Sequence, residues 1–233
     1  EFLTIEGRRL STSRNWAIWL PDYLERYDPD PLRYALSAGM PETSDSNFSW
    51  DKFLHRNNDE LVAAYGNLAH RVLTFTYRNF AGAVPSPGEL DEQSQALLRK
   101  AEATLNEVDR ELHGCNFREA LRCAMSLAQE ANRYLDVQSP WKVIKEKPDI
   151  ASMSTYTVLS VLSALKTVLY PFLPFSSEKL HALLGFTGSV QEAGWKIESL
   201  PPGQKILQPQ PLFVKLDDSI IEQETNRIGN VSY

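Results

Sequence analysis

The longest regular pattern of hydrophobic and polar positions lies between about 49 and 80. Apolar residues recur there three or four positions apart and share one helical face: Leu61, Tyr65, Leu68, Val72 and Phe75. This spacing is that of an amphipathic helix, which buries one stripe and exposes the other face. We therefore predict one long helix, followed by a linker rich in proline and glycine over 83–91.

The same spacing predicts further helices over four ranges: from the linker to 114, from 116 past 135, 152–170 and 175–184. Asn116 with Glu119 three positions later resembles a capping box at a helix start. Ser139–Pro140 is a cap-and-proline signal for a short helix that ends at Lys147–Pro148. A last polar helix is expected after 212–214.

The first 50 residues carry shorter patterns. We predict a strand over 2–5 and a helix over 15–26 that contains Pro21 in its interior. A second helix is predicted from Asp30–Pro31 to Gly39, because aspartate followed by proline is typical of a helix start.

These elements predict a mainly α fold, an antiparallel helix bundle preceded by a short α/β segment. Short connections between long helices favour antiparallel neighbours whose apolar stripes face one another. We assign residues 1–50 to the α/β segment and residues 51–233 to the bundle with its C-terminal loop and helix.

Composition narrows the class of protein. The chain has 233 residues, 42% of them hydrophobic, and a formal net charge of -6. That charge excludes a protein that coats nucleic acid by bulk attraction, so any nucleic-acid binding must be local. No apolar run approaches the ~20 residues of a membrane span, and no signal peptide is evident. We expect no membrane association, and we expect the chain, which does not begin with Met, to be part of a longer protein.

Cysteine and histidine positions argue against a metal site. Cys115 and Cys123 have no partners at ligand spacing, and none of the four histidines pairs with another histidine or a cysteine at such a spacing. We therefore predict no metal. Free thiols are typical of a reducing compartment, which favours the cytoplasm.

The first candidate for chemistry is the polar stretch from Gly7 to Trp16, which places Ser11, Thr12 and Ser13 between arginines. Hydroxyl groups and loop amides bind phosphate oxygens, and guanidinium groups grip them in pairs. A following helix adds the positive end of its dipole. The stretch therefore suggests an anion site; the alternative is a solvated loop with surface arginines.

The second candidate is a polar face of the long helix, formed by Asn67, Arg71, Thr74 and Arg78 at spacings of 4, 3 and 4. An asparagine amide beside a guanidinium group can read the edges of bases. The alternative is a face that is merely solvated.

The third candidate is Trp141, held at a helix start by Pro140. A rigid, exposed indole is a stacking platform for an unpaired base. The alternative is that Trp141 fills the end of the bundle core.

Five separated stretches, in order, resemble those of methionyl-tRNA synthetases, a family of class I aminoacyl-tRNA synthetases. They read EFLTIEGRRLSTSRNW, DPDPLRYAL, NLAHR, SPWKVIK and PLFVKLDD. The resemblance covers nearly the whole chain and corresponds to the C-terminal half of such an enzyme. It implies a stem-contact segment followed by a helical anticodon-binding domain. The catalytic Rossmann domain of the family is not in the sequence, so we expect this chain alone neither to activate methionine nor to charge tRNA.

The resemblance also implies residue roles. The KMSKS loop of the family, which closes on ATP and stabilises the departing pyrophosphate, corresponds here to four residues: Arg9, Ser11, Thr12 and Ser13. Arg9 replaces the first lysine and keeps its charge, whereas Thr12 replaces the second and removes one, for which Arg8 or Arg14 would compensate. ATP with Mg, and methionine, are implied as substrates of the full enzyme; no cofactor is implied for this chain.

In the bundle, the resemblance implies that Asn67, Arg71, Pro140 and Trp141 read the CAU anticodon of tRNA(Met), with Trp141 stacked beneath a flipped base. Two alternatives remain open. One is the corresponding part of another class I synthetase, for leucine, isoleucine, valine or cysteine. The other is a helical module that binds protein rather than RNA, which the net charge of -6 favours.

Overall fold

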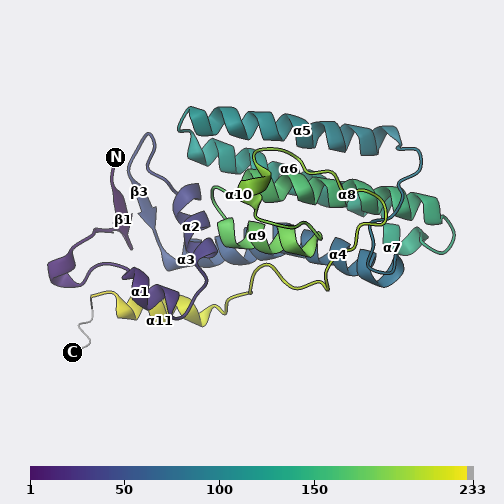
Figure 1. Ribbon diagram of the computed structural model, residues 1–233. Helices are drawn as coiled ribbons and strands as arrows, with labels where there is room; N and C mark the ends of the chain where they lie inside the picture. Colours follow the sequence, from purple (N-terminus) through teal and green to yellow (C-terminus); the bar gives the residue numbers. More distant parts are fainter. Residues whose placement is uncertain (230–233) are drawn as a thin grey trace.

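The computed structural model describes residues 1–229, and helices make up most of it (Figure 1). The strands are β1 Leu3–Ile5, β2 Arg8–Arg9 and β3 Ser46–Phe48, and the helices are α1 Leu20–Leu24, α2 Pro29–Ala38, α3 Trp50–His55, α4 Asn67–Asn79, α5 Glu92–His113, α6 Phe117–Gln138, α7 Pro140–Val143, α8 Pro148–Leu169, α9 Pro174–Leu183, α10 Val190–Ala193 and α11 Ser219–Arg227. A 3₁₀ turn spans Thr12–Arg14 and a π-helix spans Arg56–Gly66. The predicted mainly α fold is confirmed.

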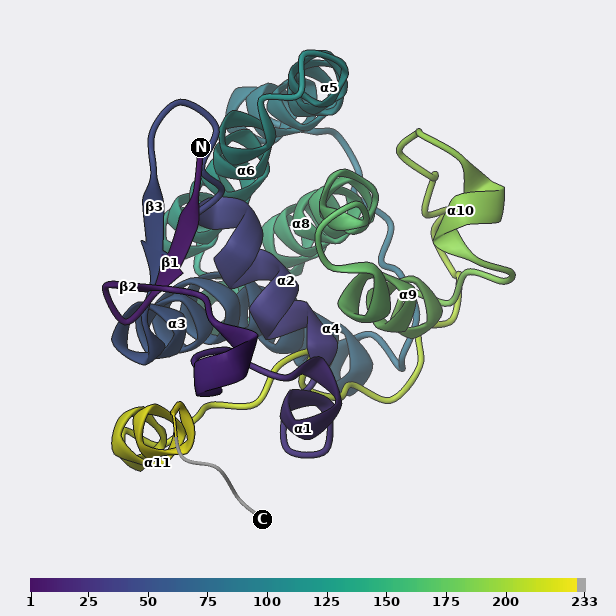
Figure 2. The same ribbon diagram turned by 90° about the vertical axis from the view of Figure 1, so that its left-hand side faces the viewer.

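Helix α8 forms the centre of the bundle, with α4, α5, α6 and α9 around it (Figure 2). Every residue from Val158 to Leu169 is buried except Ser160. A helix that is buried on every side is typical of the centre of a bundle. The neighbouring helices contribute the apolar stripes that their sequence spacing predicts, so the bundle core is continuous from α4 to α9.

The long helix predicted over 49–80 is present as one helical run from Trp50 to Asn79, formed by α3, the π-helix and α4. The Ser49 side chain caps its start and accepts a hydrogen bond from the Lys52 amide at 3.4 Å. The π-helix in its middle is not evident from the sequence. At its end, Gly66 leaves room for a ring, because a Cβ there would lie 3.1 Å from Cδ2 of Phe213.

A second, smaller core lies at the sheet end of the molecule. Strand β1 is central in the sheet, antiparallel to β2 and parallel to β3. Ile5, Tyr23 and Trp50 are buried in this core together with Ile220 and Ile228 of the C-terminal helix and turn. Helix α11 therefore returns to pack against the first segment of the chain.

Two predicted helix starts are wrong. Helix α1 begins at Leu20 and not near 15, so Pro21 lies in its first turn, where a missing N–H costs nothing. Helix α2 begins at Pro29 with Asp28 as its N-cap, two positions before the predicted cap Asp30. Asp30 is instead buried and accepts hydrogen bonds from the amide and hydroxyl of Ser176, both at 2.6 Å.

Two further local predictions are wrong. Asn116 makes no capping hydrogen bond, because its amide donates to Glu111 at 2.9 Å instead, so the predicted capping box is absent. The helix predicted to end at Lys147–Pro148 ends already at Val143, and Lys147–Pro148 instead starts α8, since proline suits a first helical turn. The sequence analysis does not predict strands β2 and β3 or helix α10, which have two, three and four residues.

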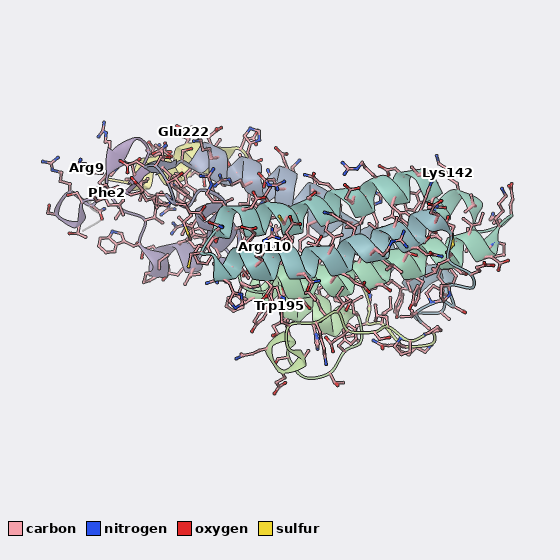
Figure 3. All side chains as sticks on the ribbon, turned by 90° about the horizontal axis from the view of Figure 1, so that it is seen from above. Phe2, Arg9, Arg110, Lys142, Trp195 and Glu222 are labelled. Atoms are coloured by element: carbon pink, nitrogen blue, oxygen red, sulfur yellow. The ribbon has the colours of Figure 1, made fainter. Side chains whose placement is uncertain are left out.

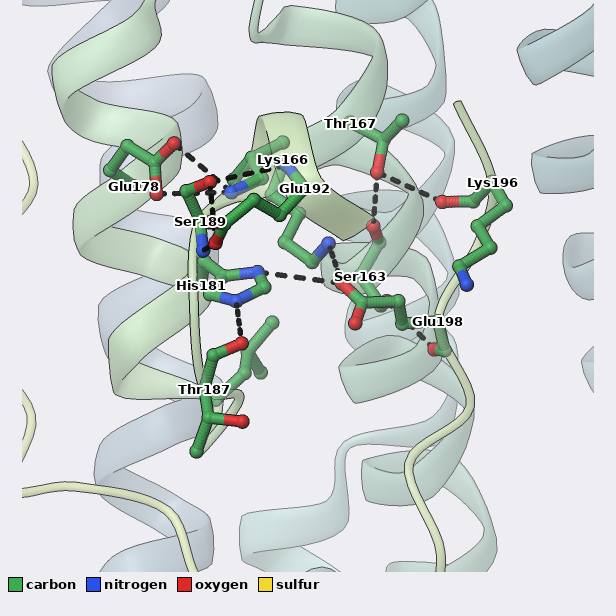
Figure 4. Close-up of polar contacts among 12 residues, drawn as sticks. Ser163, Lys166, Thr167, Glu178, His181, Thr187, Ser189, Glu192, Lys196 and Glu198 are labelled. Carbon is green, nitrogen blue, oxygen red and sulfur yellow. Dashed lines mark hydrogen bonds and ion pairs between the residues drawn. The ribbon is translucent and has the colours of Figure 1, made fainter. Parts of the chain in front are cut away.

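The segment 184–200 is held against the bundle by a polar cluster (Figure 4). The fully buried Lys166 of α8 donates to Glu198 at 2.5 Å, and His181 of α9 lies 3.4 Å from the same carboxylate. Ser163 donates to the Glu198 carbonyl at 2.8 Å, and Thr167 to the Lys196 carbonyl at 3.0 Å. The polar side chains of α8 thus fix a segment that has little regular structure.

The assignment of residues 1–50 and 51–233 to separate parts stays a prediction. A helix begins at Trp50, but α11 shares a core with the first segment. Among residues 1–229, no helix is both long and apolar enough to span a membrane.

Candidate functional site

The polar face of α4 lies open to solvent at the helix start. Asn67, Arg71 and Arg78 are exposed and Thr74 is half-buried, whereas Leu68 and Val72 of the apolar stripe are buried. The face is thus separate from the core, as the spacing predicts. The Asn67 side chain has no hydrogen-bond partner within residues 1–229, so its donor and acceptor are both available.

Trp141 is presented at the surface by a sharp turn between α6 and α7. Ser139 ends α6 in a left-handed conformation with φ 42°, and the buried Pro140 begins α7. The Ser139 hydroxyl donates to the Asp136 carbonyl at 2.8 Å and steadies the turn. Trp141 is 37% exposed and is not part of the bundle core, so the alternative of a core-filling tryptophan does not hold.

The structure brings Arg71 and Trp141 together. The guanidinium carbon of Arg71 lies 4.5 Å from the centroid of the Trp141 ring, within the range of a cation–π contact. Arg71 also lies 3.7 Å from the Asp136 carboxylate. Asn67, Arg71 and Trp141 therefore form one surface, which we call the α4–α7 face, with hydrogen-bonding groups beside a flat aromatic ring.

The second candidate site is the loop after β2. Ser11 and Trp16 exchange main-chain hydrogen bonds of 3.0 and 2.8 Å and close the loop into a small hairpin. The 3₁₀ turn Thr12–Arg14 forms its tip, and Asn15 follows in a left-handed conformation with φ 50°. The hydroxyl oxygens of Ser11 and Ser13 lie 3.3 Å apart.

Arginines surround a cavity of about 580 Å³ beside this loop, lined by Arg8, Arg9, Ser11, Arg14, Trp16 and Gly229. None of these arginines forms an ion pair with a residue of the described part of the chain, 1–229. Unpaired guanidinium groups next to hydroxyls are suited to phosphate oxygens. Of the predicted loop residues, Arg9 and Ser11 line the cavity, whereas Thr12 and Ser13 do not.

The two candidate sites lie far apart. Lys142, which follows Trp141, lies at one end of the molecule, and Arg9 lies at the other (Figure 3). The bundle joins them as a spacer.

Three residues of these sites were not predicted: Asp136 beside Arg71, and Trp16 and Gly229 beside the loop. No spacing connects Gly229 with the loop in the sequence, so only the fold brings them together. In residues 1–229, no group of three or more acidic, histidine or cysteine side chains is arranged to hold a metal ion. Cys115 and Cys123 are free thiols. Burial, with Glu107 nearby, raises the pKa of Cys123 to about 11.

Comparison with known proteins identifies methionyl-tRNA synthetases in both stretches of the chain that match a family model. Residues 1–73 match the family model of class I (M) tRNA synthetases, and residues 84–232 match that of the anticodon binding domain of methionyl tRNA ligase. A methionine–tRNA ligase of Dehalococcoides mccartyi is 56% identical over 229 residues, which are 98% of this chain and 41% of the relative. One from Roseiflexus castenholzii is 45% identical over 254 residues and is covered to 43%.

A solved structure of similar fold is Mycobacterium tuberculosis methionyl-tRNA synthetase in complex with methionyl-adenylate. It is 28% identical, with a TM-score of 0.84 over 91% of this chain and 42% of that one. The chain thus spans about two fifths of the length of the relatives it matches.

Proposed function

The chain belongs to the methionyl-tRNA ligase family, and from that premise we propose that it recognises the CAU anticodon of tRNA(Met) through its α4–α7 face. The observation that carries the proposal is the placement of Arg71 against Trp141 at 4.5 Å, with Asn67 one turn away on the same helix face. Sequence-specific proteins read unpaired bases by stacking them on aromatic rings and bonding their edges. The face offers both kinds of contact, and it does so locally, which suits a chain of net charge -6.

We propose further that the loop around Ser11 contacts ATP when the catalytic part of such an enzyme is present. Pyrophosphate carries charge that positioned guanidinium groups stabilise as it departs. Arg8 and Arg14 line the same cavity as Arg9, which supports the idea that they replace the charge missing at Thr12. ATP with Mg, and methionine, would be substrates of the whole enzyme. This chain alone is expected not to activate methionine, and its compartment is expected to be the cytoplasm.

The anticodon proposal is tested with a short stem-loop RNA carrying CAU and a second one with a single changed anticodon base, at fixed moderate salt. The Trp141→Ala change should weaken CAU binding by about 1–3 kcal/mol, the usual contribution of one stacked base. Trp195→Ala is the matched control, because Trp195 is also 37% exposed but lies against α5, where its indole donates to the Leu105 carbonyl.

Equal binding of the two loops, or equal losses in the two tryptophan variants, would contradict anticodon reading by this face. RNA binding that does not change when Asn67, Arg71 and Trp141 are substituted would favour the alternative, a helical module that binds protein.

A further inference from the structure

The turn that follows α11 touches the loop around Ser11. The Gly229 amide donates a hydrogen bond to the Asn15 carbonyl at 2.9 Å. Gly229 has φ +82°, and a Cβ added to it would lie 3.2 and 3.3 Å from two carbons of the Trp16 ring. The backbone of Gly229 therefore packs directly on Trp16, in a conformation that favours glycine.

Trp16 in turn contacts β1, β2 and the loop itself. Its indole nitrogen donates to the Ile5 carbonyl of β1 at 2.9 Å. The Arg8 guanidinium of β2 lies 4.6 Å from its ring centroid. Its main chain closes the hairpin with Ser11. Movement of this ring would therefore shift both the base of the loop and one of the arginines that line the cavity.

The turn is itself firmly anchored. Glu224 of α11 is only 3% exposed and accepts two hydrogen bonds from the Arg26 guanidinium, at 3.0 and 2.8 Å, and one from the Tyr27 hydroxyl at 3.0 Å. Bidentate pairs of this kind are strong and directional. Because Ile228 is buried in the core shared with β1, Gly229 is presented to the loop by a fixed support.

We propose that Trp16 and Gly229 are positioning residues of the ATP-contacting loop. The C-terminal turn holds the Trp16 ring, and the ring holds the Ser11–Trp16 hairpin and Arg8 in the arrangement that lines the cavity. The loop is thus ordered by a helix about two hundred positions later in the chain. This inference rests on the proposed role of the loop in ATP contact.

The test compares Gly229→Ala with Gly88→Ala. Both glycines have positive φ, +82° and +61°, but a Cβ at Gly88 meets nothing within 4 Å. The readout is hydrogen exchange, by NMR, of the Ser11 and Trp16 amides and of the Trp16 indole N–H. Gly229→Ala should speed their exchange about tenfold relative to Gly88→Ala, because local opening becomes easier. Exchange in the bundle helices should not change.

A second readout is titration with inorganic pyrophosphate, followed by the amide signals of the loop. Gly229→Ala should weaken pyrophosphate binding severalfold, while Gly88→Ala should not. If Gly229→Ala fails to fold, Trp16→Phe takes its place, since it removes the indole donor and keeps a flat ring.

Loop exchange that is the same in Gly229→Ala and Gly88→Ala, or in Trp16→Phe and the unchanged chain, would overturn the positioning role. Faster exchange in a chain that shows no pyrophosphate binding would leave the positioning role standing. That result would instead contradict the proposed phosphate contact of the loop.

Discussion

Tyr65, on the π-helix, is completely buried, and its hydroxyl has no hydrogen-bond partner among residues 1–229. Burial first, and then the charge of Asp30, raises the pKa of this hydroxyl. Asp30 is itself buried, and burial raises its pKa although Ser176 donates two hydrogen bonds to it. These polar groups lie where α2, α9 and the long helix meet, so the junction between the two cores contains buried groups that oppose its stability.

Tyr65→Phe should therefore stabilise the protein, by about 1 kcal/mol at pH 7, because it removes a buried hydroxyl that is not paired. The gain should grow above pH 10. In the unchanged protein, the Tyr65 hydroxyl has a higher pKa in the folded state than in the unfolded state. The unfolded state therefore ionises first, and the folded protein loses stability as pH rises from the unfolded pKa towards the folded one, whereas the Phe variant has no such loss. The measurement is urea unfolding at pH 7 and at alkaline pH. Tyr77→Phe, at an exposed position, is the control; a destabilised Tyr65→Phe protein would show that the hydroxyl is paired in solution.

At the scale of elements, the polar cluster that fixes segment 184–200 is asymmetric. Lys166 is fully buried, whereas the Glu198 side chain is 19% exposed. Burial lowers the pKa of Lys166, although the hydrogen bond and charge of Glu198 oppose that shift. The ammonium group therefore depends on this carboxylate more than the carboxylate depends on it.

Glu198→Gln should be the costlier change, at about 3 kcal/mol, because it leaves a buried charge without its counter-ion. Lys166→Met should cost clearly less, since Glu198 can turn to water and an apolar chain fills the space. For Glu198→Gln, part of the loss should recover as pH rises through the lowered pKa of Lys166, where the ammonium group gives up its proton. Urea unfolding of both variants over pH 7–10 decides the matter, and equal losses would mean that the charge of Lys166 is already compensated.

Most elements follow from the sequence because their signals are local. The apolar stripes of α4, α5, α6 and α8 repeat at helical spacing, and that alone predicts the bundle. Cap signals are less secure, since an Asn or Asp side chain can bond elsewhere: Asn116 pairs with Glu111, and Asp30 serves α9 rather than its own helix. The exposed residues Asn67, Arg71 and Trp141 follow from pattern, but the contact between Arg71 and Trp141 needs the packed bundle.

At the scale of the whole molecule, the α4–α7 face and the arginine-lined cavity occupy opposite ends of one structure (Figure 3). Between them lie the bundle and the continuous helix from Trp50 to Asn79. Sites this far apart that share no side chains are expected to act independently in their affinities. A rigid spacer fixes the separation of the sites without any need to transmit a signal.

Arg14→Ala should weaken pyrophosphate binding and leave the affinity for the CAU stem-loop unchanged. Trp141→Ala should weaken binding of the CAU stem-loop and leave the affinity for pyrophosphate unchanged. In the double variant, the loss of affinity for each ligand should equal, within about 0.5 kcal/mol, the loss in the single variant that affects that ligand, because distant substitutions act independently. Calorimetric titrations of the four proteins with each ligand measure this. A larger deviation would show that the long helix couples the two ends.

The return of α11 to the smaller core at the sheet end has a consequence for the order of events during synthesis on the ribosome. The bundle helices up to α9 are close in sequence and can pack as they emerge, since domains fold largely in the order in which they are made. The strand that contains Ile5 emerges before the bundle helices, yet its core also requires Ile220 and Ile228. The apolar side chains of β1 are thus enclosed only after the bundle has been made, and they remain exposed until translation has passed α11.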